Sequence, residues 1–153
     1  MVRHIVGSHE DADDVVQNTF IKAWTKQDEF RGDSKVSTWL HRIAVNEALD
    51  FLRRQKKHSN NTSDPQALTA AASMHGDSAD AFFDGDEIER LLREAIDTLP
   101  EAQRVTFTMK YYDNMQYSEM SKILGTSEGG LKANYHHAVE KIKRYVLAVG
   151  GLK

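Results

Sequence analysis

A short stretch near the C-terminal end of the chain has the residue types and spacing needed to bind a phosphate backbone. Gly125 ends one apolar helical segment, and Ser127 can cap a second helix that starts directly after it. At about 100° per residue, Gly129 and Ala133 fall on the exposed side of this second helix. Small residues allow close approach of a ligand, and the free N–H groups of a helix N-terminus suit a phosphate. The pattern indicates a DNA-binding helix-turn-helix, although an ordinary helical hairpin with a glycine turn also fits it.

Three side chains of the same helix could contact DNA directly. His136 shares the exposed side, and Lys132 and His137 flank it. The opposite side is an apolar stripe that repeats every three or four residues: Leu131, Tyr135, Ala138, Ile142 and Val146. This stripe must pack on a helical core, so the polar side is free to face a partner.

A second basic cluster ends a helix expected over residues 36–57. Its members are Arg53, Arg54, Lys56 and Lys57. They suit the C-terminal end of a helix dipole, and they also supply charges for phosphate contacts. Trp39 lies near Arg31 and Lys35, which makes an aromatic and basic neighbourhood able to stack on bases, although a tryptophan at this spacing is more often a core residue.

The net charge of −3 hides an uneven distribution of charge along the chain. Residues 31–57 carry seven basic and three acidic groups, and residues 120–153 carry six and two. Residues 58–86 separate them with five acidic groups and no basic one. Two basic patches of this kind are the usual electrostatic footprint of a nucleic-acid partner.

The sequence gives little support to an enzyme or a metal site. There is no cysteine, which excludes disulfides and thiolate ligands. His136 and His137 are adjacent, so they cannot form an i, i+4 metal pair on one helix face. No nucleophile–base pattern is visible, and we expect no catalytic residue, metal or cofactor. No apolar run is long enough to span a membrane and no secretory signal is visible, so we expect a cytoplasmic protein without membrane insertion.

The elements that must position these residues are all helical. A helix is expected over residues 10–26. Its inner, buried stripe is predicted to consist of Ala12, Val16, Thr19, Phe20 and Ala23. Its far side carries Asp14, Gln17, Asn18 and Ile21, which is either a solvated face with a stray isoleucine or a docking surface for a protein.

The remaining periodicity divides the chain into two small helical modules. Residues 1–57 form the first module, and Ser34 is a possible cap for its second long helix. Residues 58–86 lose helical periodicity and read as a flexible linker that could extend to roughly 100 Å. Residues 87–153 contain four expected helices, the first with an apolar stripe from Ile88 to Leu99 that Pro100 ends. The predicted fold class is therefore all-α.

Three stretches of the chain, in this order, resemble the extracytoplasmic-function (ECF) group of bacterial RNA polymerase sigma factors. They are EDADDVVQNTFIKAW at residues 10–24, FRGDSKVSTWLHRIAVNEALDFLRR at residues 30–54, and LPEAQRVTFTMKYYDNMQYSEMSKILGTSEGGLKANYHHAVEKIK at residues 99–143. The resemblance implies that the first module is sigma region 2, which docks on the polymerase clamp and melts the minus-10 element. It implies that the second is region 4, which reads the minus-35 element and contacts the flap.

The resemblance also assigns roles to individual residues. Polymerase binding falls on Asp14, Gln17, Asn18 and Ile21. Minus-10 recognition falls on a loop and the helix after it, through Arg31, Lys35, Ser37, Thr38, Trp39, Asn46, Asp50, Arg53 and Arg54. Minus-35 recognition falls on Ser127, Lys132, Ala133, His136 and His137. The implied partners are core RNA polymerase and promoter DNA, and an anti-sigma factor is left open.

Departures from the family pattern keep two alternatives open. Relatives often carry Thr, Ser and Arg where this chain has Gly130, Ala133 and Asn134, and Arg where it has His137, so the minus-35 preference of relatives cannot be assumed for this chain. The family's region 2 also begins with a helix of about twenty residues, of which only residues 2–6 could be the tail. We expect this to expose part of the first module's apolar stripe. The alternatives are a two-domain helix-turn-helix regulator and an inactive sigma-like interaction module.

Overall fold

All regular secondary structure is helical in the part of the chain that the computed structural model describes, which comprises residues 1–30, 32, 35–61 and 84–150. The first module contains α1 (Val2–Val6), α2 (His9–Thr25), the 3-10 helix η1 (Gln27–Glu29) and α3 (Val36–Asn61). The second contains α5 (Asp84–Asp97), α6 (Glu101–Tyr111), α7 (Tyr117–Leu124) and α8 (Glu128–Gly150). The predicted all-α fold is confirmed. None of the helices in these ranges is long and apolar enough to cross a membrane.

Local sequence signals place most of the helix ends. The Ser8 side chain accepts a hydrogen bond from the Asp11 backbone N–H at 3.2 Å and so caps α2. Gly125 ends α7 with φ of 68°, a left-handed conformation that glycine adopts without strain. Ser127 accepts a hydrogen bond from the Gly130 N–H at 3.1 Å, as expected for the cap of α8. The helix-turn-helix expected from the sequence is therefore present as α7, a turn at Gly125, and α8.

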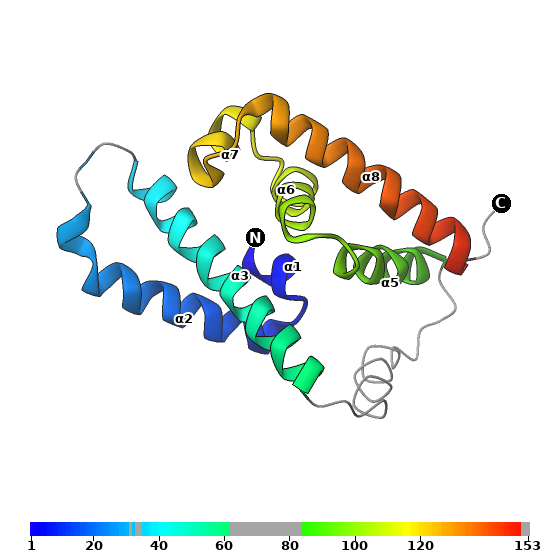
Figure 1. The fold of residues 1–153 in the computed structure, drawn as a ribbon, viewed down its shortest axis with the longest axis horizontal. Helices are drawn as coiled ribbons and strands as arrows, with labels where there is room; N and C mark the ends of the chain where they lie inside the picture. The colour runs from blue at the N-terminus through cyan, green and yellow to red at the C-terminus, as the bar shows by residue number, and fades with distance from the viewer. Residues whose placement is uncertain (31, 33–34, 62–83, 151–153) are drawn as a thin grey trace.

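Helix α6 of the second module lies at the centre of the molecule, between the first module and helices α5 and α8 (Figure 1). α2 and α3 pack on each other and α1 packs on both of them, while α5, α6 and α7 all pack on α8. α1 also contacts α6, and α3 contacts α7. The modules are thus in direct contact through two pairs of helices.

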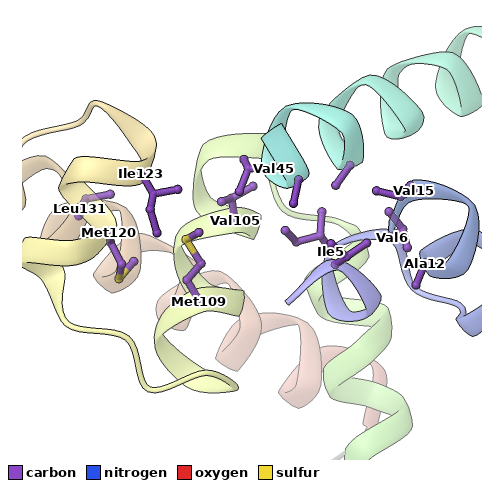
Figure 2. Packing of buried hydrophobic residues seen from close by; sticks show 13 residues of the cluster. Ile5, Val6, Ala12, Val15, Val45, Val105, Met109, Met120, Ile123 and Leu131 are labelled. Atoms are coloured by element: carbon purple, nitrogen blue, oxygen red, sulfur yellow. The ribbon is translucent and has the colours of Figure 1, made fainter. Parts of the chain in front are cut away.

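Two apolar clusters form the core, and α6 contributes to both. Val105 and Met109 join one cluster, whereas Phe107 joins the other because it points about 200° away from Val105 on the helix. The first cluster also contains buried residues of α1, α2, α3, α7 and α8, which Figure 2 shows as one continuous group. The second contains buried residues of α5, α6 and α8, together with Leu99 from the turn between α5 and α6. A single cluster therefore extends from the first module into the second.

Two expected stripes differ from the observed burial. Ala12 and Thr19 are buried as predicted, but the prediction that Val16 and Phe20 face inward is wrong, because both are exposed and Val15 is buried. Val16 and Phe20 each follow a buried residue and are turned about 100° further round the helix. Ile88 was also expected in the inner stripe of α5 but is exposed.

The structured helices reach into the stretch expected to be a linker. α3 continues to Asn61 and α5 begins at Asp84, so the expected linker boundaries at residues 58 and 86 fall inside helices. The middle of that stretch, residues 62–83, and the possible cap Ser34 lie outside the described residues.

Candidate nucleic-acid interface

The exposed side of α8 carries the residues expected to face the minus-35 element. Ser127, Lys132, Ala133, His136 and His137 are all exposed. The opposite stripe packs into the protein, where Leu131, Ala138 and Ile142 are buried. Because these buried residues fix the rotation of α8, the four candidate residues within the helix lie together on one accessible surface, with Ser127 at the cap that precedes it. We refer to this surface as the α8 face.

A tyrosine at the start of α7 organises the positive charge beside the α8 face. The Lys110 and Lys132 ammonium groups lie over the Tyr117 ring, at 4.7 and 5.7 Å from its centroid. Lys110 also donates a hydrogen bond to the Met115 carbonyl oxygen at 3.2 Å. Cation–π contacts of this kind hold a lysine in place while its charge stays available. Sequence spacing could not identify this arrangement, because Tyr117 and Lys132 meet only after α7 and α8 have packed.

Close packing at the N-terminus of α8 requires a glycine at position 130. A Cβ atom on Gly130 would lie 3.1 Å from both the Ser127 hydroxyl and the Thr126 side chain, which would crowd the Ser127 cap. Gly129 has open space around it. A phosphate could therefore approach the first turn of α8 on the Gly129 side.

The candidate minus-10 residues on α3 lie on an exposed side of that helix, where Asn46, Asp50, Arg53 and Arg54 are all accessible. Arg53 does not point freely into solvent, because its Nε and Nη2 donate hydrogen bonds to the two carboxylate oxygens of Glu101 at 3.0 and 2.9 Å. The Arg53 hydrogen bond lowers the pKa of the Glu101 carboxyl below its ordinary value. Arg53 also lies 3.4 Å from Asp50.

The loop before α3 is only partly described. Arg31 lies outside the described residues, while Lys35 and Ser37 are exposed. Thr38 is 3% exposed, so its side chain is turned into the protein. Trp39 is half-buried and packs against Phe30 at 5.3 Å between ring centroids, which fits the expectation that it supports the fold.

A groove separates this loop from the start of the helix-turn-helix. Its volume is about 660 Å³, and it is lined from both modules by Gly32, Lys35, Thr38, Arg42, Gln116, Ser118, Glu119 and Lys122. Three of these residues are basic and one is acidic, so the groove is favourable for an anion. Sequence spacing could not predict that the two modules would form this groove jointly.

The candidate polymerase surface lies on α2. Asp14, Gln17 and Asn18 are exposed, and Ile21 is 61% exposed. The same helix exposes Phe20 and Trp24, the latter by 74%. The apolar part of this surface is therefore larger than the single isoleucine expected from the sequence, and these two aromatic residues were missed as surface residues.

Comparison with family models divides the chain in the same order as its helices. Residues 1–58 match the model for sigma-70 region 2, and residues 89–142 match the model for sigma-70 region 4. An ECF RNA polymerase sigma-E factor of Salmonella typhimurium is 33% identical over 142 residues, which cover 89% of this chain and 74% of the relative. A factor of the same description from Haemophilus influenzae is 29% identical over 144 residues, covering 91% and 76%.

Two solved structures share the fold. The sigma factor RpoE of Bartonella quintana, crystallised with the anti-sigma factor NepR, has a TM-score of 0.65 at 21% identity and covers 95% of this chain and 86% of its own. CnrH in complex with the cytosolic domain of CnrY also has a TM-score of 0.65, at 22% identity, and covers 96% and 78%. Each chain is therefore matched along most of its length.

Proposed function

This chain belongs to the ECF group of sigma-70 RNA polymerase initiation factors, and we propose that it binds core RNA polymerase and directs it to promoters through two separate DNA contacts. The observation that carries the proposal is the order of the family matches, with region 2 at residues 1–58 and region 4 at residues 89–142. We take region 2 as residues 1–57, the linker as 58–86 and region 4 as 87–153. The proposal assigns no catalytic step to the chain itself.

Region 2 contacts the polymerase clamp through the exposed side of α2. Ile21 is 61% exposed among the polar residues Asp14, Gln17 and Asn18. Burial of an exposed apolar side chain by a partner stabilises the complex. The relatives' designation as RNA polymerase sigma factors supports a polymerase as that partner.

The other long helix of region 2 and the loop before it open the minus-10 element. Lys35, Asn46, Arg53 and Arg54 are exposed for contacts with the strands. Unstacking a base costs a few kcal/mol, and stacking on an aromatic side chain returns about 1 to 3 kcal/mol. The chain alone therefore does not melt DNA, and binding to polymerase must supply the difference.

Region 4 reads the minus-35 element with the α8 face. Lys132 contacts phosphate, and His136 and His137 lie nearest to the base edges. Because glycine and alanine occupy positions 130 and 133, the sequence read differs from that of relatives with larger polar residues there. Region 4 also contacts the polymerase flap.

An anti-sigma factor is a further proposed partner. Of the two solved structures that share this fold, one is a sigma factor in complex with the anti-sigma factor NepR, and the other is CnrH in complex with the cytosolic domain of CnrY. Such a partner would compete with polymerase for the same chain.

The decisive experiment is transcription from a promoter library with purified core polymerase. Adding the chain should produce transcripts that core enzyme alone does not make, and their start sites should share two sequence elements. Ile21→Glu should remove these transcripts. Binding of DNA without any effect on transcription would instead identify a helix-turn-helix regulator, and failure to bind either partner would identify an inactive sigma-like module.

A further inference from the structure

A cavity of about 260 Å³ lies where the first two helices of the chain meet α5 and the end of α6. In Figure 1, α1 lies between α3 and α5, and the cavity has walls from both modules. Region 2 contributes Arg3 and His4 of α1 and the start of α2, while region 4 contributes Glu89, Arg93 and Tyr112. None of the described residues assigned to promoter DNA or to polymerase lines it. The cavity is therefore separate from the surfaces described above.

Two arginines from different modules give the cavity positive charge. Arg3 forms no ion pair with another described residue. Arg93 pairs with Glu89 of its own helix at 3.9 Å, and both side chains are about half exposed, so this pair contributes little. Both guanidinium groups are therefore available to a ligand. A guanidinium group suits a phosphate or a carboxylate, because its planar N–H donors match two oxygens at once.

Further donors line the cavity beside the arginines. The first turn of α2 begins there with Ser8 and His9, and the N–H groups of a first turn have no partner within the helix. The helix dipole also favours a negative charge at this end. An anion in the cavity would therefore meet donors from the backbone as well as from the arginines.

The His4 ring forms part of the same wall. It stacks on Tyr112 with 3.6 Å between ring centroids, and its Nδ1 is buried without a hydrogen-bond partner among the described residues. Burial lowers the pKa of His4, and positive charges that include Arg3 and Arg93 lower it further. The surroundings of His4 thus disfavour an additional cation and favour an anion.

We propose that this cavity binds a small oxyanion, carrying a phosphate or a carboxylate group, between Arg3 of region 2 and Arg93 of region 4. Its volume lies just below the range of about 300 to 1,000 Å³ typical of sites for drug-sized ligands, so the ligand is a small molecule. Glu89 opposes binding, because it competes with the ligand for Arg93. The bound anion joins the two modules, since its partners come from both. This binding does not depend on the transcription function proposed above.

The test measures binding to the full chain by isothermal titration calorimetry, with inorganic phosphate, glycerol 3-phosphate and succinate as probes. At least one probe should bind one molecule per chain with a Kd of about 1 mM or tighter. A phosphate-containing probe that binds more tightly than succinate assigns the site to phosphates, and the reverse order assigns it to carboxylates. The absence of saturable binding by all three probes would overturn the proposal.

Two neighbouring arginines of α5 give a matched pair of variants. Arg93→Gln should weaken binding by at least about ten-fold, the effect of losing a charge-assisted hydrogen bond. Arg90→Gln removes the same charge from the same helix, but Arg90 pairs with Glu94 at 3.3 Å and does not line the cavity, so affinity should stay within about two-fold. Equal affinities of the two variants would overturn the proposal.

Two further variants locate the anion. Glu89→Gln removes the competing carboxylate and should tighten binding by about two- to five-fold, and an unchanged or weaker affinity would contradict contact with Arg93. Lys132→Ala removes a cation from the α8 face and should not change binding. Loss of binding in Lys132→Ala with none in Arg93→Gln would place the anion on the α8 face and overturn the proposal.

Amide hydrogen exchange tests whether the site is shared by the two modules. The tightest probe, at saturation, should slow exchange in both α1 and α5 of the parent chain and in neither helix of Arg93→Gln. Slower exchange in α5 alone would show that region 2 takes no part, which would overturn a site between the modules. This readout requires neither polymerase nor promoter, so it decides the inference even if the proposed function fails.

Discussion

Regions 2 and 4 bury their apolar side chains in different ways. One cluster of region 4 is closed by its own helices, with Ala95, Phe107 and Ile142 from α5, α6 and α8. The buried residues of region 2 instead continue into region 4, because Ile5 and Val45 share a cluster with Met120. Region 4 therefore has a core that survives separation of the modules, whereas region 2 loses part of its apolar contact when they separate. Helix α6, which faces both clusters, is the element that makes this difference possible.

The largest expected effects come from substitutions that remove a buried side chain from one cluster or the other. Met120→Ala and Ile142→Ala each remove a buried side chain, and each should cost about 2 to 5 kcal/mol of stability. Met120→Ala should increase amide hydrogen exchange in α3 as well as in region 4, because its cluster spans both modules. Ile142→Ala should increase exchange in α5, α6 and α8 and leave α3 protected. The same exchange pattern in both variants would contradict the assignment of separate cores.

A large effect is also expected at a position outside both cores. Ile21→Glu should reduce core-polymerase affinity by at least about 2 kcal/mol, since it places a charge in a desolvated interface. Ile21 is 61% exposed, so helicity and stability should not change. Binding measured by fluorescence anisotropy checks this, with Ile21→Leu as the apolar control that should bind normally. If Ile21→Glu binds core polymerase as tightly as the parent, region 2 does not use this side of α2.

The sequence was most informative where one helix has one buried side. The stripe of α8 and the turn at Gly125 are confirmed, because an amphipathic helix with a clear stop signal needs no knowledge of its neighbours. Helix α6 shows the limit of this reasoning. Val105 and Met109 recur at helical spacing and are buried on one side, but Phe107 is buried as well, because a second cluster covers the opposite side.

The candidate site residues show the same limit. A resemblance to a family assigns positions such as Arg53 and Thr38 to DNA, but it cannot say what they contact within the chain. Arg53 pairs with a glutamate 48 residues away, and Thr38 is buried. Such contacts depend on how two modules pack, and periodicity within one helix carries no information about that packing. The exposure of Phe20 was missed for a related reason. Phe20 is only about 100° from the buried Thr19 around α2, and periodicity alone did not distinguish the two positions.

A smaller effect is expected from an ion pair that lies entirely within region 2. Lys22 forms an ion pair with Glu47, whose side chain is only 6% exposed, and this pair joins α2 to α3. Lys22→Met should destabilise region 2 by about 1.5 to 3 kcal/mol, because it leaves a buried carboxylate without its charged partner. Urea denaturation measures the loss of stability, and amide hydrogen exchange in α2 and α3 shows that it falls on region 2. Lys26→Met removes the same charge at the exposed end of α2 and should have little effect; an equal loss in both variants would show that net charge, and not the ion pair, matters.

The smallest expected effects concern DNA binding by region 4, where two neighbouring residues should behave differently. Lys132→Ala removes a phosphate contact, so it should weaken all promoter sequences about equally and reduce the slope of log affinity against log salt by about one. His136→Ala removes a base contact, so it should change which sequences are preferred, by roughly 1 to 3 kcal/mol per altered base pair. Affinity selection on a randomised minus-35 library at two salt concentrations measures both. Because Lys132 lies over Tyr117, Tyr117→Phe is a control that keeps the ring and should behave like the parent. If both alanine variants lose affinity uniformly across the library, the α8 face grips the backbone only, and the sequence must be read by other residues.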